Sequence, residues 1–137
     1  MKTPWLVLAL FGTTAAHAEP LKVEVVPATL TWQQKKPVEV TLRVSNTSKS
    51  EATFQAMGCS WDEHWRSSDR ELTWERWGCD KNAPSTVALA PGKTREWKLS
   101  MFATAAATLG AHSLAMTFTP RGGTPMKSGA VTITVTR

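Results

Sequence analysis

The feature that most constrains the fold of this chain is a strict alternation of apolar and polar side chains. It is clearest over residues 38–44 (VEVTLRV), where valine and leucine take every second position and polar or charged residues stand between them. Successive side chains of a β-strand point to opposite faces of a sheet, so this segment predicts a strand with one face in the core. We expect Val40 and Leu42 to be buried there and Arg43 to face solvent.

Short segments of the same kind recur along the chain, and none shows an apolar period of 3.6 residues over the length of a helix. Turn-forming sequences such as residues 45–50 and Pro91-Gly92 separate them. This spacing predicts an all-β, immunoglobulin-like, two-sheet β-sandwich of about seven to nine strands, formed by a single domain over residues 19–137. The expected strands are residues 21–26, 29–32, 38–44, 52–57, 85–90, 94–101, 112–118 and 130–136.

Residues 1–18 have the composition of a cleavable signal peptide. Lys2 supplies a positive charge, residues 5–11 form an apolar run too short to span a bilayer, and Ala16-His17-Ala18 places small residues where a signal peptidase needs them. This pattern predicts cleavage after Ala18 and a periplasmic or secreted protein. No second apolar run follows, so no integral membrane segment is expected in the mature chain.

The two cysteines, Cys59 and Cys79, are expected to form a disulfide bond, because exported proteins usually oxidise an even set of cysteines. The bond would close a loop with 19 residues between the cysteines. Such a loop contributes about 3 kcal/mol by restricting the unfolded chain. The same segment holds four of the seven tryptophans, which predicts a cross-linked, tryptophan-rich excursion from the sandwich.

Several of these segments together resemble a known kind of domain. The strand that ends with residues 42–48 (LRVSNTS), then Phe54, the tryptophan-bearing segment, residues 89–92 (LAPG) and Trp97 resemble bacterial immunoglobulin-like domains. Among these domains the pattern is most similar to the intracellular proteinase inhibitor family of bacteria. The resemblance covers residues 38–101 and implies the sandwich fold.

The sequence lacks the motifs that would indicate an enzyme. It contains no Gly-x-Ser-x-Gly, no His-Glu-x-x-His and no glycine-rich phosphate loop. Asp62 and Glu63 are neighbouring carboxylates, but neighbours on a strand point to opposite faces and could not flank one bond. We therefore expect a non-catalytic protein that has no cofactor and no metal site.

Copper binding is an alternative that the sequence leaves open. Asp62 and His64 are two residues apart, and His112 with Met57, Met101 or Met116 could complete a set of imidazole and thioether ligands. This alternative requires His64 to lie within ligand reach of His112 or of a methionine.

The main functional hypothesis rests on the segment between the cysteines. Tryptophan and arginine are the residues most enriched at binding hot spots, and the spacing of the tryptophans does not fit one face of a strand. Trp61 and Trp77, nearest the cysteines, are expected to be buried, and Trp65 and Trp74 to be nearer the binding surface. The candidate binding residues are Trp61, Trp65, Arg66, Arg70, Trp74, Arg76 and Trp77.

This surface would suit a protein partner, and inhibition of a protease or another envelope enzyme is one specific form of such binding. A carbohydrate-binding module is the alternative if the indoles are coplanar with flanking acids or carboxamides. The net charge is +5, but residues 62–81 carry six acids and four bases, so the positive charge lies elsewhere in the chain. This distribution is not that of a nucleic-acid binder, and the sequence leaves the oligomeric state open.

Overall fold

The computed structural model describes residues 20–137, so the predicted signal peptide lies outside the described residues. These residues form β-strands and one turn of 3₁₀ helix, with no α-helix between residues 20 and 137. The all-β class predicted from the alternation is confirmed. The strands are β1 (Leu21–Pro27), β2 (Thr31–Gln33), β3 (Val38–Asn46), β4 (Ala52–Met57), β5 (Trp65–Ser67), β6 (Leu72–Thr73), β7 (Pro84–Leu89), β8 (Thr94–Ala103), β9 (Gly110–Leu114), β10 (Met116–Phe118), β11 (Met126–Lys127) and β12 (Val131–Thr136), and the 3₁₀ turn η1 is Trp61–His64.

The strands fall into two groups by length. Seven strands have five or more residues, and five further strands have only two or three. The seven longer strands account for the predicted range. Of the shorter ones, β2 and β6 pair with the longer strands β12 and β8, and β5, β10 and β11 form a small sheet of their own. Residues 112–118, predicted as one strand, divide into β9 and β10 because β9 pairs with β12 whereas β10 pairs with β5 and β11.

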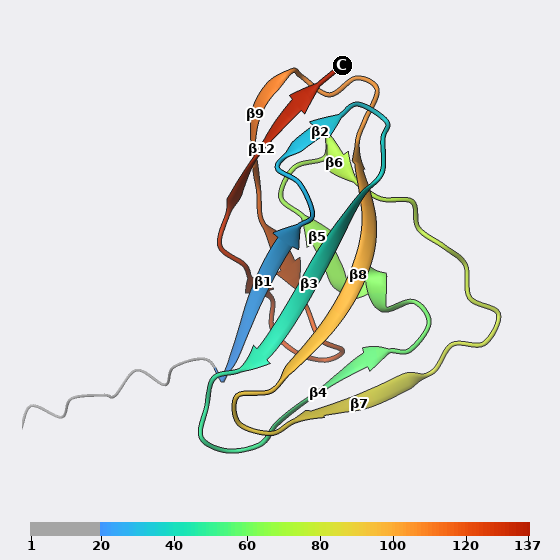
Figure 1. Cartoon of the computed structure of the whole chain (residues 1–137). Coiled ribbons are helices and arrows are strands. Elements are labelled where there is room, and N and C mark those ends of the chain that lie inside the picture. The colour runs from blue at the N-terminus through green and yellow to red at the C-terminus, as the bar shows by residue number, and fades with distance from the viewer. Residues whose placement is uncertain (1–19) are drawn as a thin grey trace, which may run out of the picture.

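The largest sheet has the strand order β1-β3-β8-β6, and β3 is its centre (Figure 1). β3 pairs antiparallel with β1 on one side and with β8 on the other. Its side chains alternate between buried and more exposed along all nine residues. Val40, Leu42 and Val44 have no accessible surface, as the sequence predicts.

Three smaller sheets complete the molecule, with the orders β2-β12-β9, β11-β10-β5 and β4-β7. Aromatic rings from four strands meet between the sheets. Trp97 of β8 lies 5.7 Å from Phe118 of β10 and 5.8 Å from Trp65 of β5, measured between ring centroids, and Phe54 of β4 lies 5.3 Å from Phe118. This packing of one sheet on the others gives the sandwich-like arrangement.

A long segment of the described chain, residues 74–83, departs from this regular structure. Between β6 and β7 the chain runs without strand pairing along one side of the fold (Figure 1). Almost every side chain from residue 75 to residue 86 is exposed. In residues 20–137, no helix has the length and apolar character that crossing a membrane requires.

Candidate functional site

The segment from Cys59 to Cys79, called the disulfide loop below, is the excursion predicted from the sequence. It contains η1, β5, a turn, β6 and an extended stretch over residues 74–78. Cys59 and Cys79 form a disulfide bond with 6.0 Å between their Cα atoms, so the predicted pairing is confirmed. The loop therefore begins and ends at one cross-link at the end of β4.

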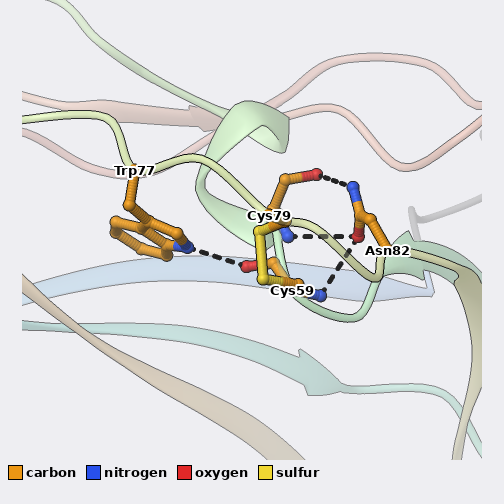
Figure 2. The surroundings of a disulfide bond; sticks show 5 residues. Cys59, Trp77, Cys79 and Asn82 are labelled. Atoms are coloured by element: carbon orange, nitrogen blue, oxygen red, sulfur yellow. Dashed lines mark hydrogen bonds between the residues drawn. A yellow bond between two sulfur atoms is a disulfide. The ribbon is translucent and has the colours of Figure 1, made fainter.

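Hydrogen bonds fix the chain on both sides of the disulfide (Figure 2). The Asn82 carboxamide oxygen accepts the backbone N–H of Cys59 at 3.2 Å and of Ser60 at 3.3 Å. The Asn82 amide donates to the Ser60 hydroxyl at 2.6 Å, and the indole N–H of Trp77 donates to the Cys59 carbonyl at 3.0 Å. Asn82 was not among the candidate residues, because it lies outside the cysteine pair and its role depends on the folded turn.

The tryptophans do not divide as the sequence suggested. Trp65 and Trp74 are buried, whereas Trp61 is half-buried and Trp77 is 39% exposed. The expectation that Trp61 and Trp77 are buried and that Trp65 and Trp74 are nearer the binding surface is therefore wrong in its assignment of burial, although Trp74 lines the arginine hollow described below. Trp65 is buried because its strand, β5, pairs with β10 and places Trp65 opposite the core residue Phe118. Trp77 is exposed because its stretch of chain joins no sheet.

Asp62 connects the buried tryptophans to the arginines. It lies in η1 with no accessible surface, while its neighbour Glu63 is exposed. The indole N–H of Trp74 donates to Asp62 Oδ2 at 3.1 Å, and Arg76 Nη1 lies 3.7 Å from the same oxygen. The Arg76 guanidinium also lies 5.1 Å from the centroid of the Trp74 ring. One buried carboxylate therefore orients both the indole and the guanidinium.

Arg66, Arg70 and Arg76 line one hollow of about 240 Å³, and these three residues are called the arginine face below. Ser67, Asp69, Thr73 and Trp74 complete its wall. A second hollow of about 430 Å³ adjoins it and shares Arg66 and Arg76. Within residues 20–137, Arg66 and Arg70 take part in no ion pair. The fold thus brings together the three arginines that the sequence singled out.

The two histidines lie in separate hydrogen-bond networks. His64 Nε2 accepts the Met57 backbone N–H at 2.8 Å, and Nδ1 lies 2.9 Å from the Thr119 carbonyl, to which it donates. Both ring nitrogens of His64 are therefore held by the backbone. This arrangement leaves no lone pair of His64 for copper.

His112 forms the other network. Its Nδ1 lies 2.7 Å from Asp69 Oδ2, and its Nε2 lies 2.7 Å from the Thr108 carbonyl and 3.7 Å from Glu71 Oε2. The hydrogen bond to Asp69 and then that to Thr108 raise the pKa of His112, although burial opposes them. Asp69, Glu71 and His112 place three possible ligand atoms within 4.8 Å of one another. A ring that donates from both nitrogens is an imidazolium, however, and imidazolium is a poor metal ligand.

The carbohydrate alternative required coplanar indoles. Trp61 and Trp77 are neighbours, with ring centroids 5.3 Å apart, but their planes are inclined at 66°. This is an edge-to-face pair, and it presents no flat double platform to a sugar.

Sheet packing and the cross-linked loop define an all-β, sandwich-like protein with an arginine-lined surface. Comparison with solved structures finds a protein with a similar fold. No family model matches the sequence. No curated protein matches it either. Among solved structures the fold is similar to Spo0M, a sporulation control protein from Bacillus subtilis, with a TM-score of 0.54 and 11% sequence identity. The alignment covers 88% of this chain and 51% of Spo0M, so this chain spans about half the length of that protein.

At this identity the likeness concerns the fold alone. It supports a distant relationship in β-rich architecture and gives no support to the resemblance to the intracellular proteinase inhibitor family.

Proposed function

We propose that this chain is an exported, non-catalytic binding protein that engages a protein partner through the arginine face of its disulfide loop. The observation that carries the proposal is the convergence of Arg66, Arg70 and Arg76 on one hollow. Arginine is enriched at binding hot spots because its guanidinium donates five hydrogen bonds in a planar fork. A partner that presents carboxylates at the contact is the natural complement of this surface.

The setting of Arg76 supports the same proposal. Its guanidinium lies 3.7 Å from Asp62 Oδ2 and 5.1 Å from the centroid of the Trp74 ring, and both contacts favour the position from which it lines the hollow. Arg66 and Arg70 have no ion partner within the part of the chain that the structure describes. Inhibition of a protease or another envelope enzyme is one specific form of this function, in which the loop would cover the partner's own site.

The test compares charge reversals on and away from the arginine face. Arg66→Glu and Arg70→Glu each change the net charge by the same amount as Arg121→Glu, a control on an exposed loop. Immobilised wild-type protein and the three variants would be exposed to envelope extract, and any captured protein identified by mass spectrometry and titrated after purification. Loss of a hot-spot arginine costs about 2 kcal/mol or more, which is roughly a thirtyfold loss of affinity.

We expect Arg66→Glu and Arg70→Glu to lower the affinity by at least about this factor, whereas Arg121→Glu leaves it within about threefold. Thermal melting should give similar midpoints for all four proteins, because exposed substitutions rarely change stability by more than about 0.5 kcal/mol. A partner that binds the wild type and both loop variants equally well would contradict the proposal.

A further inference from the structure

A second surface lies where β6 and β8 separate. β6 pairs with β8 over two residue pairs only, Leu72 with Ala103 and Thr73 with Phe102. If this register continued, Glu75 would lie opposite Ser100. The chain leaves β8 instead, and a hollow of about 440 Å³ occupies the space between them.

We call this space the fork. Glu75 and Trp77 line it from the disulfide loop, and Leu99, Ser100 and Phe102 line it from β8. Lys35 and Pro37, which precede β3 on the opposite side of β8, also line it, so the hollow reaches across β8. Within residues 74–77, Glu75 and Trp77 line the fork whereas Trp74 and Arg76 line the arginine hollow, so the two spaces are lined by different side chains of this stretch.

One edge of β8 is open along the fork. β3 pairs with β8 from Thr94 to Met101 on the other edge, while β6 covers only the last two residues of the strand. In residues 20–137 no strand pairs with the second edge of β8 before Phe102. An open edge presents a row of backbone N–H and C=O groups that can pair with another extended chain.

The cross-link keeps the loop from closing on this edge by itself. The disulfide and the bond from the Trp77 indole to the Cys59 carbonyl tie the far end of the extended stretch to residue 59. Since the indole N–H is already bonded, the exposed part of Trp77 that lines the fork is its apolar ring. The fork therefore combines unpaired backbone with apolar walls, and this combination fits a peptide better than a rigid small molecule.

We propose that the fork binds an extended peptide segment of another protein, which adds as a strand to the free edge of β8. Backbone hydrogen bonds would supply affinity, and one large apolar side chain would fill the space between Trp77 and Phe102. A space of about 440 Å³ is within the usual range for a ligand pocket, roughly 300–1,000 Å³. Lys35 and Glu75 at the rim favour residues of opposite charge on either side of that apolar side chain.

The test uses a peptide that the chain itself supplies. A synthetic copy of residues 38–46 (VEVTLRVSN) has the alternation that already pairs with the other edge of β8, and it would be titrated into ¹⁵N-labelled protein. A scrambled peptide of the same composition is the control. We expect saturable shifts of the amide signals of residues 95–101 and of the Trp77 indole with the alternating peptide only.

Three variants make the result specific. Trp77→Ala should weaken binding at least tenfold, Trp77→Phe should retain it within about threefold because an aromatic wall remains, and Ser100→Trp should abolish it by filling the fork from the strand side. Ser100 is exposed, so this last variant tests the fork without removing a core contact. Arg66→Glu should leave peptide affinity unchanged, which separates a failure here from a failure of the proposed function.

Four results would overturn the proposal. These are an absence of shifts at millimolar peptide, equal shifts with the scrambled peptide, shifts confined to β7, and unchanged affinity in the Ser100→Trp protein. Concentration-dependent shifts of the same β8 amides without peptide, together with a dimer in sedimentation, would show that the occupant is a second copy of this chain and would also overturn it.

Discussion

At the scale of single residues, Asp62 and His112 are buried polar groups that contact side chains lining the arginine hollow. Asp62 accepts the Trp74 indole N–H and lies beside Arg76, so the arginine face is built on a buried carboxylate. His112 is bonded to Asp69, which itself forms part of the arginine hollow. A buried polar atom costs free energy unless it is hydrogen-bonded, and within residues 20–137 Asp62 has a hydrogen-bond donor at Oδ2 but none at Oδ1.

His112 predicts a dependence of stability on pH. Its pKa is raised in the folded protein, chiefly by the hydrogen bond to Asp69, so the folded state holds the proton more tightly than the unfolded state. The stabilisation is complete below the unfolded pKa of about 6.5 and is lost as the pH rises through the higher folded value. We expect the free energy of unfolding of the wild type to fall as the pH rises from about 6.5 through the raised pKa of folded His112.

Urea titrations across this range would measure the fall, and His112→Gln is the control. Glutamine cannot carry the proton, so the variant should be less stable at pH 6 and show a flatter profile. The acids facing His112 are Asp69 and Glu71. Parallel profiles for the wild type and His112→Gln would contradict the assignment.

At the scale of elements, the pairing of β3 with β1 and β8 organises the main sheet. β3 is paired along both edges, and its inward side chains are fully buried at Val40, Leu42 and Val44. β8 is paired along one edge for most of its length, which leaves the fork. The same sheet therefore supplies a strand that is paired along both edges and a strand with one edge largely unpaired.

Neighbouring residues of β3 should differ strongly in their contribution to stability. Leu42→Ala should lower the free energy of unfolding by about 2–5 kcal/mol, because it leaves a cavity in a packed core. Arg43 is half-buried and its Nε lies 2.7 Å from Glu96 Oε1. Because partly exposed ion pairs contribute little, Arg43→Ala should cost only about 0–1 kcal/mol. Denaturant titrations of the two variants compare these values, and equal losses would mean that the faces of the strand are wrongly assigned.

At the scale of the whole molecule, stability is distributed unevenly around the disulfide loop. The interlayer core contains rings from β4, β5, β8 and β10, whereas residues 75–86 are exposed almost throughout. The open segment is attached by the disulfide, by Asn82 and by Trp77. A rigid sandwich thus carries a surface segment that borders both proposed binding surfaces.

Hydrogen exchange should report this difference. Backbone amides of β3 should exchange most slowly, since they are paired, buried and opened only by global unfolding, and amides of residues 75–83 should exchange fastest. Exchange measured by mass spectrometry on the oxidised protein gives both rates, with β1 as an internal reference of intermediate burial. Protection of residues 75–83 equal to that of β3 would contradict this view and would indicate that the segment is already covered.

The sequence by itself determined the longer strands, the all-β class and the cysteine pair, but not the short strands β5, β6 and β11. Strand positions such as residues 38–44 follow from local alternation, because successive side chains of a strand point to opposite faces of the sheet. The disulfide follows from the presence of only two cysteines, together with the expectation of export. These features need no knowledge of which strands become neighbours.

Only the tertiary structure decided which loop tryptophans are buried and where the open edge lies. Within residues 59–79 no regular alternation extends far enough to define a face, so each side chain takes its position from a distant partner. Trp65 is buried by the pairing of β5 with β10, Trp74 is held by Asp62, and Trp77 is exposed because its chain separates from β8. These contacts join segments far apart in sequence, and local pattern carries no information about such long-range pairing.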